Sequence, residues 1–408
     1  MKVRPALILL AAALTVSLSA CGSTTGTTGG DVTDVTLSVW SPQQDQDGSP
    51  SWLAKQEEAF QAAHPEYKIT WNNAVVPEDQ AANTVKQDPG SAADVFMFAN
   101  DQLGGLIQAN AIGKLPQNVV DQVKAQNDDL MIESVTGPDG SLYGVPYTAN
   151  TWFMYYDKSK LTADDVKSLD TMLAKGKVAF PLDTAWYFAS FYVGNGGTLF
   201  GPEGNDEAAG IDFGGTKGSD VTTYLAGLVK NPNFVNDAQS AGLAGLKNGT
   251  GVAYFSGSWD AEAVKAALGA NMGAAQPPTI SLNGKDVQIK AFAGSKAAGF
   301  NPSSKNPTAA AQFAAFLGSK AAQQDHYTMR TIIPSDKTLA SDPTISVDPV
   351  AIAQMDTVRN ASILQPTVPA MGDYWTPAED FAKALLSGDV TADNAAEKTE
   401  AWNNGYKS

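Results

Sequence analysis

The chain has 408 residues, of which 43% are hydrophobic and 17% are charged; this composition is typical of a globular protein and excludes a disordered chain. The length is too great for one small hydrophobic core, so we expect two lobes of ordinary domain size. The formal net charge is −16, or −18 without Lys2 and Arg4. A surface of this sign repels phosphates, which disfavours nucleic acid and anionic lipid as partners.

The N-terminus has the pattern of a secretory signal. Lys2 and Arg4 precede an apolar segment, residues 5–16, that is too short to span a membrane. The segment ends in Leu18-Ser19-Ala20-Cys21, which resembles the lipobox of bacterial lipoproteins. We therefore expect residues 1–20 to be removed, Cys21 to carry a lipid anchor, and residues 21–33 to form a flexible tether. The protein would then lie on the extracellular face of the cell membrane of a Gram-positive-like bacterium, or in a periplasm.

Strands alternate with helices in the first hundred residues of the folded part. The patterns predict strands at residues 35–40, 67–71 and 94–99 and helices at residues 51–63 and 78–86. This alternation predicts a parallel sheet with helices on both faces. Ligands of such sheets meet the carboxyl ends of the strands, so we expect residues 40–47 and 98–105 to face a ligand.

The next feature is a turn at residues 137–140 followed by a long predicted strand at residues 145–156. The middle of this strand, residues 147–151, is mostly small and polar between apolar flanks. That composition is typical of a strand that crosses an open space between two packed bodies. We therefore expect the first lobe to end near Tyr147 and a ligand to lie against this crossing.

The second half repeats the strand and helix alternation. The patterns predict strands at residues 177–181, 251–255 and 289–292 and helices at residues 170–175, 186–192, 220–229, 241–247, 260–268, 307–317, 320–330, 378–386 and 394–404, with a further helix starting at residue 349. Several crossings between lobes imply that each lobe is built from discontinuous segments. We assign residues 34–147 and 294–334 to the first lobe and residues 148–293 and 335–408 to the second.

The residues give little support to an enzyme. His64 and His326 are the only histidines, and neither has a metal-ligand spacing around it. No nucleophile elbow, phosphate loop or zinc motif is present, and nothing implies a cofactor or a metal. A glycosidase needs only two carboxylates, which the 43 acidic residues leave open, but no pair is singled out.

Three tryptophans favour a binding protein. Trp186, Trp259 and Trp375 each stand at a loop or helix start beside Gly, Pro or Ser, and not within an apolar face. Core packing explains most tryptophans, but at such junctions a flat ring can stack on the C–H face of a sugar. Asp101, after a buried strand, either caps a helix or accepts hydrogen bonds from ligand hydroxyls, and the two roles are compatible.

Five stretches together resemble the family 1 extracellular solute-binding proteins of ABC importers. Within this family, they are most similar to the maltose- and maltodextrin-binding proteins. The similarity covers nearly the whole chain after the tether. The stretches are VFMFANDQLGGLIQAN, PYTANTWFMYYDKSKL, WYFASFYVGNGGTLF, LKNGTGVAYFSGSW and QPTVPAMGDYWTPAEDF.

The resemblance implies roles for residues of the first lobe. Phe98 stands where the family has a Trp, Asp101 matches a hydroxyl-binding Asp, and Gln102 replaces an Arg. The residues that fall where the family has an Asp-Lys pair are Gln43, Gln44 and Asp45.

The resemblance also implies ligand contacts on the crossing strand and in the second lobe. Asn150 replaces a Glu on the crossing strand. Trp186 stands at a stacking Tyr, and Trp259 and Trp375 match two stacking Trp residues. Two further positions are polar, since Asp183 or Thr184 lies near a hydroxyl-binding Glu and Glu379 stands where the family has an Arg.

The family implies a two-lobed α/β fold of the type II periplasmic-binding-protein kind, which closes on its ligand about hinge crossings. We therefore expect a monomeric, lipid-anchored protein that binds maltose or a related α-glucoside oligosaccharide and delivers it to the transmembrane subunits of an ABC permease. Because several positions depart from the family, another di- or oligosaccharide, such as trehalose, sucrose or an α-galactoside, is the alternative. A surface glycoside hydrolase is the alternative from a different class.

Overall fold

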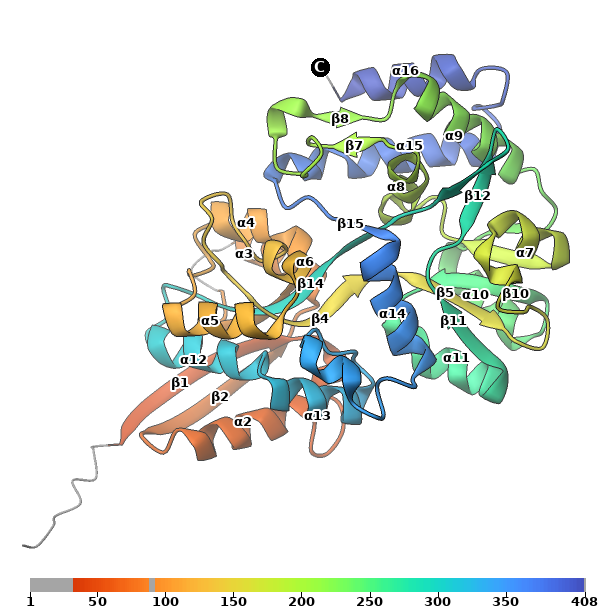
Figure 1. The fold of residues 1–408 in the computed structure, drawn as a ribbon. Helices are drawn as coiled ribbons and strands as arrows, with labels where there is room; N and C mark the ends of the chain where they lie inside the picture. The colour runs from red at the N-terminus through yellow and green to blue at the C-terminus, as the bar shows by residue number, and fades with distance from the viewer. Residues whose placement is uncertain (1–31, 88–91, 407–408) are drawn as a thin grey trace, which may run out of the picture.

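The computed structural model describes residues 32–87 and 92–406, and these form two bodies, each built on one sheet with helices packed against it (Figure 1). The predicted signal segment, Cys21 and nearly all of the tether lie outside the described residues. The two-lobed α/β fold expected from the sequence is confirmed. No described helix is both long enough and apolar enough to cross a membrane.

The sheet of the first lobe has the order β15-β14-β3-β1-β2, with β4 also paired to β14. The strand β1 (Thr33–Ser41) runs parallel to β2 (Tyr67–Val75) and to β3 (Val95–Ala99), as predicted. The sheet is nevertheless mixed, because β14 (Ala291–Phe300) is antiparallel to β3 and β4 (Val145–Thr151) is antiparallel to β14. The edge strand β15 (Ser362–Leu364) pairs with residues 291–293 of β14, at the end of that strand that packs in the second lobe, and Ile363 packs against the second-lobe core.

Helices cover this sheet and bury one continuous apolar core. Ser51 caps the helix α2 (Trp52–Ala63), and its hydroxyl accepts a hydrogen bond from the Ala54 backbone N–H at 3.1 Å. The pair α12 and α13 has the predicted bounds. The helices of this lobe are α1 (Gln43–Gln46), α2 (Trp52–Ala63), α3 (Ala81–Gln87), α4 (Leu103–Gln108), α5 (Gln117–Gln126), α6 (Asp129–Glu133), α12 (Pro307–Leu317) and α13 (Lys320–Arg330).

The sheet of the second lobe has the order β11-β5-β10-β6-β9. Its strands are β5 (Phe153–Asp157), β6 (Lys177–Phe180), β9 (Phe234–Asn236), β10 (Gly251–Ser256) and β11 (Met272–Ala275). Two hairpins lie outside it, β7 (Thr198–Leu199) with β8 (Ile211–Asp212) and β12 (Thr279–Leu282) with β13 (Lys285–Gln288). The helices are α7 (Leu169–Lys175), α8 (Ala185–Gly194), α9 (Gly215–Leu228), α10 (Ala241–Lys247), α11 (Ala261–Leu268), α14 (Pro349–Asn360), α15 (Trp375–Ser387) and α16 (Ala395–Gly405).

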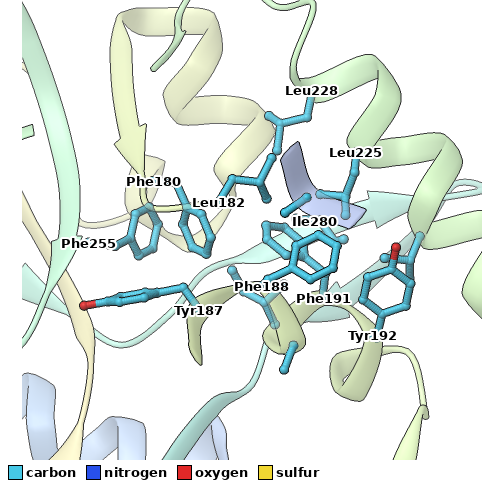
Figure 2. Packing of buried hydrophobic residues seen from close by; sticks show 14 of the residues in the cluster. Phe180, Leu182, Tyr187, Phe188, Phe191, Tyr192, Leu225, Leu228, Phe255 and Ile280 are labelled. Atoms are coloured by element: carbon cyan, nitrogen blue, oxygen red, sulfur yellow. The ribbon is translucent and has the colours of Figure 1, made fainter. Parts of the chain in front are cut away.

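The core of the second lobe is strongly aromatic. Figure 2 shows Phe188 and Phe191 of α8 packed among side chains of β6, α9 and β10. The ring of Phe180 meets those of Phe191 and Phe255 edge-on, at centroid distances of 5.2 and 4.8 Å. The lobe built on this core carries Trp186, Trp259 and Trp375, the three tryptophans singled out from the sequence.

Three segments connect the lobes. The strands β4 and β14 run side by side from the Val145–Ala298 pair to the Thr151–Ala293 pair (Figure 1). Residues 333–335 lie along β4, because the Thr148 hydroxyl donates to the Ile333 carbonyl at 2.5 Å and the Ser335 N–H donates to the Tyr147 carbonyl at 3.2 Å. The core of the first lobe takes its residues from 35–147 and 297–332. The lobe boundaries that we assigned at residues 147, 293 and 334 stay a prediction.

Two predicted elements differ from the structure. The single strand at residues 145–156 is broken, because Trp152 is fully buried in the second core and separates β4 from β5. The return strand predicted at residues 289–292 is β14, which continues to Phe300. Its Ala, Gly and Ser residues have weak strand propensity, so only pairing to both β3 and β4 shows that they form a strand.

The first-lobe core offers a stability test at Phe313. This ring is fully buried on α12 and lies 5.0 Å from the ring of Phe60 and 4.7 Å from that of Trp71. We expect Phe313→Ala to lower the free energy of unfolding by about 3–5 kcal/mol, measured by chemical denaturation. Phe316→Ala on the same helix is the control, since its side chain is only partly buried. Equal losses in the two variants would contradict this account of the core.

Candidate functional site

A cleft of about 860 Å³ lies between the lobes, against the crossing strands, within the size range of small-ligand sites. Side chains of both lobes and of both crossing strands line it. The residues are Glu78, Asp79, Gln80, Asn83, Ala99, Asp101, Asn150, Trp186, Trp259, Lys296, Gln365, Trp375 and Glu379.

The second-lobe wall of the cleft is built from three indole rings. Trp186 lies in the first turn of α8, Trp259 in the short helix η7 (Ser258–Asp260), and Trp375 at the start of α15. The Trp186 indole N–H donates to Oε1 of Gln365 at 2.8 Å, and its ring lies 6.2 Å from that of Trp259 at an angle of 40°. The orientation of Trp186 is therefore fixed by Gln365.

The Trp259 ring lies directly over the backbone of Gly257. A β-carbon at position 257 would be 2.1 Å from a ring atom of Trp259, so only glycine leaves room for the indole here. The Trp259 side chain is 43% exposed, which is unusual for so large an apolar group. The ring is thus a supported, open platform on the wall of the cleft.

The first-lobe wall presents carboxylates. Asp101 lies in the short helix η3 (Asn100–Gln102), and the Gln102 amide donates to its Oδ2 atom at 2.7 Å. Burial raises the pKa of Asp101, the negative charge of Asp79 adds to this rise, and the Gln102 hydrogen bond opposes it. Asp101 therefore takes up a proton at a higher pH than an ordinary aspartate.

A buried ion pair forms the floor of the cleft. Oε1 of Glu78, in the short helix η1 (Glu78–Gln80), lies 3.2 Å from Nζ of Lys296 and accepts a hydrogen bond from the Tyr147 hydroxyl at 2.9 Å. Burial alone would raise the pKa of Glu78, but Lys296 and these hydrogen bonds lower it below its usual value. Burial and the charge of Glu78 raise the pKa of Tyr147, which stays a hydroxyl donor.

Most of the residues expected from the sequence meet at this cleft. Trp186, Trp259, Trp375, Asp101, Asn150 and Glu379 all line it. Gln102 lies in an adjoining crevice of about 280 Å³ that shares Asp101 and Trp375 with the cleft. Gln44 lines a narrow hollow beside the cleft, together with Trp259 and Lys296.

Three expected ligand contacts do not reach the cleft. Phe98 is fully buried in the first-lobe core, since β3 is covered on both faces. Asp45 is also fully buried, with its Oδ1 atom 2.8 Å from Nε2 of His326. Asp183 lies outside the lining of the cleft and close to Asp237, whose pKa is raised by burial and then by Asp260 and Asp183.

Several cleft residues were missed from the sequence. Glu78, Asp79 and Gln80 follow β2, so the rule for strand carboxyl ends could have found them. Lys296 is the one charged residue of β14, which is itself a signal. The others are Asn83, Ala99 and Gln365.

The chemistry of the cleft suits a flat, hydroxyl-rich ligand. Indole rings on one wall can cover the C–H face of a ring, and carboxylates on the other wall can accept hydrogen bonds from hydroxyls. Within residues 32–87 and 92–406, no three His, Cys, Asp or Glu side chains lie together as a metal site would require.

Comparisons with known proteins agree with this geometry. The family model described as bacterial extracellular solute-binding protein matches residues 55–353. The galactooligosaccharide-binding protein of Bacillus subtilis (strain 168) is 25% identical over 418 residues, covering 96% of this chain and 94% of the relative. A maltooligosaccharide ABC transporter solute-binding lipoprotein of Streptococcus pneumoniae serotype 4 is 29% identical, covering 75% of this chain and 74% of the relative.

A solved structure described as being with acarbose is 48% identical, with a TM-score of 0.86, over 91% of this chain and 98% of that chain. Since the family model covers well over half of the sequence, the chain belongs to the bacterial extracellular solute-binding proteins.

Proposed function

We propose that this protein captures a maltodextrin-type oligosaccharide in the cleft between its lobes. The observation that carries the proposal is the arrangement of three indole rings of the second lobe opposite carboxylates of the first. The rings supply stacking surfaces along the sugar, and the carboxylates accept hydrogen bonds from its hydroxyls. The relative that is named for maltooligosaccharide binding, and the similar structure with acarbose, support the same class of ligand.

Capture works by closure about the crossing strands. A sugar that touches both walls stabilises the closed state over the open one, because only the closed state makes both sets of contacts. The pairing of β4 with β14 keeps the lobes in register while they move. The closed shape is then the state that the transmembrane subunits of an ABC permease receive.

The alternative ligand is another di- or oligosaccharide, such as trehalose, sucrose or an α-galactoside. The name of the Bacillus subtilis relative, a galactooligosaccharide-binding protein, supports this alternative ligand class. Calorimetric titration with maltodextrins, trehalose, sucrose and α-galactosides decides between them. The same titrations, followed by an assay for new reducing ends, test for glycoside hydrolysis, and we expect none.

The protein acts outside the cell as a lipid-anchored monomer. The lipobox-like segment that ends at Cys21 supports the anchor, as does the lipoprotein name of the Streptococcus pneumoniae relative. Labelling with a radioactive fatty acid, with Cys21→Ser as the control, tests the anchor.

Removing the indole rings should weaken binding of maltotriose. We expect each of Trp186→Ala, Trp259→Ala and Trp375→Ala to lower the affinity about tenfold or more, and the triple variant to abolish measurable binding, because aromatic anchors contribute most to such contacts. Isothermal titration calorimetry measures the effect. Trp71→Phe, in β2 and outside the cleft lining, is the control and should bind normally. A triple variant with unchanged affinity would refute the proposal.

Asn150 should influence which sugar binds best. Its Nδ2 atom lies 3.5 Å from Oδ1 of Asn100 at the crossing, and it lines the cleft. Asn150→Glu introduces a longer side chain that only accepts hydrogen bonds, so we expect a changed ranking in the calorimetric panel. Asn360→Glu adds the same charge at the exposed end of α14 and is the control. An unchanged ranking would mean that Asn150 is only part of the hinge.

A further inference from the structure

Lys296 is an unusual residue for its position. It is the only charged residue of β14, whose other members are small or apolar and buried, and its own side chain is 20% exposed. A charge so far from bulk water lowers stability unless it is paired. Since an apolar residue would fit the pattern of the strand, the lysine points to a role other than packing.

A bulge between the crossing strands brings Lys296 to the floor of the cleft. Lys296 pairs with Thr148, and the next residue, Ala297, pairs with Pro146, so Tyr147 is an extra residue on β4. Such bulges redirect side chains. Here Lys296 and Tyr147 both reach the same Oε1 atom of Glu78, at 3.2 and 2.9 Å.

The ammonium of Lys296 has donors to spare. In the described part of the chain it makes one hydrogen bond, to Glu78, although an ammonium carries three N–H groups. It also lines both the cleft and the narrow hollow beside it. The remaining N–H groups are therefore available to an acceptor atom in the cleft.

Lys296 is also the only basic side chain among the described residues that line the cleft, whereas four carboxylates line it. These are Glu78, Asp79, Asp101 and Glu379. The charge of Lys296 lowers the pKa of both carboxyls: the pKa of Glu78 lies below its usual value despite burial, whereas burial keeps the pKa of Asp101 raised. Two of the hydrogen-bond acceptors of the site thus depend on this lysine.

We propose that Lys296 is a specificity-determining residue of the sugar site, whose ammonium donates to a hydroxyl or glycosidic oxygen of the oligosaccharide at the hinge and balances the carboxylates that accept from its hydroxyls. This role rests on the proposed function of the cleft. It assigns to the crossing strand β14 a direct contact with ligand, beside the contacts made by the two walls. A deoxy sugar that lacks the acceptor oxygen at this point is discriminated against.

The pH dependence of binding gives this role a distinct signature. Glu78 and Asp101 are stronger hydrogen-bond acceptors as carboxylates than as protonated carboxyls, so full binding is present above their folded-state pKa values and is progressively lost as the pH falls through them. Without Lys296 both pKa values rise. Binding is then lost at a higher pH than in the wild type. The charged groups around Lys296 are Glu78 and Asp79 from η1 and Asp101 from η3, with the Tyr147 hydroxyl from β4, and the charge of Asp79 raises the pKa of Asp101 further.

The test compares Lys296→Met with the wild type by calorimetry, using maltotriose from about pH 7 down to about pH 5, a range above ordinary carboxyl pKa values of about 4, so that mainly carboxyls with a raised pKa titrate in it. We expect the variant to bind about tenfold or more weakly near neutral pH, because hydrogen bonds from charged donors are strong. The deficit should widen as the pH falls. Lys296→Arg keeps the charge and the donors and should recover part of the affinity.

Lys383→Met is the matched control. Lys383 lies on α15, with its Nζ atom 3.7 Å from Oε2 of the cleft residue Glu379, but it does not line the cleft itself. Its removal should leave the pH profile as in the wild type. Wild-type affinity in Lys296→Met, or a deficit that is the same at every pH, would overturn the proposal.

The double variant Glu78→Gln/Lys296→Met covers the case in which the single variant fails to fold, since it leaves neither charge of the pair unpaired. It should also bind weakly, and wild-type binding by it would equally overturn the role of Lys296. If the wild type binds no maltodextrin, the proposed ligand is wrong. The Lys296 variants are then compared on the oligosaccharide that the wild type does bind, so the two failures are distinguishable.

Discussion

The pairing of β4 with β14 is the constraint on which the rest of the structure depends. The strand β4 is paired from end to end with residues 293–298 of β14, and β14 contributes Phe292 to the second core and Phe300 to the first. Lobes joined by such a ribbon cannot slide past each other without breaking backbone hydrogen bonds. Bending of the ribbon is the motion that remains, and it opens or narrows the space above it.

The location of the site follows from this ribbon. The strands of the first sheet end near it, so Asp101 comes into the cleft directly after β3. The second lobe brings Trp186 and Trp375 from the first turns of α8 and α15. Neither wall alone surrounds a ligand, because most of the carboxylates are on the first lobe and the three indole rings are on the second. Affinity is therefore coupled to the angle of the hinge.

Local patterns predicted those parts of the fold in which local and tertiary preferences agree. The helices α12 and α13 were predicted with their observed bounds, since Pro307 and Ser319 stand where helices begin. The break at Trp152 and the extent of β14 were not predicted, because both follow from packing between distant segments. The helices α4 and α6 were also missed, because segments of six and five residues are too short to show a helical period, and the ten-residue α5 was missed as well.

The residues of the candidate site also differ in how far they could be predicted from the sequence. The three tryptophans could be identified as candidate ligand contacts from their sequence neighbours. An aromatic residue at a loop or helix start, beside Gly, Pro or Ser, is not part of the apolar face of a helix that packs in the core. Phe98 and Asp45 could not be judged from the sequence, since their burial depends on what covers them from elsewhere in the chain. Lys296 is the informative intermediate case. A single charged residue is unfavourable in a buried strand of small residues. Positions that are unfavourable for the fold in this way are often functional sites.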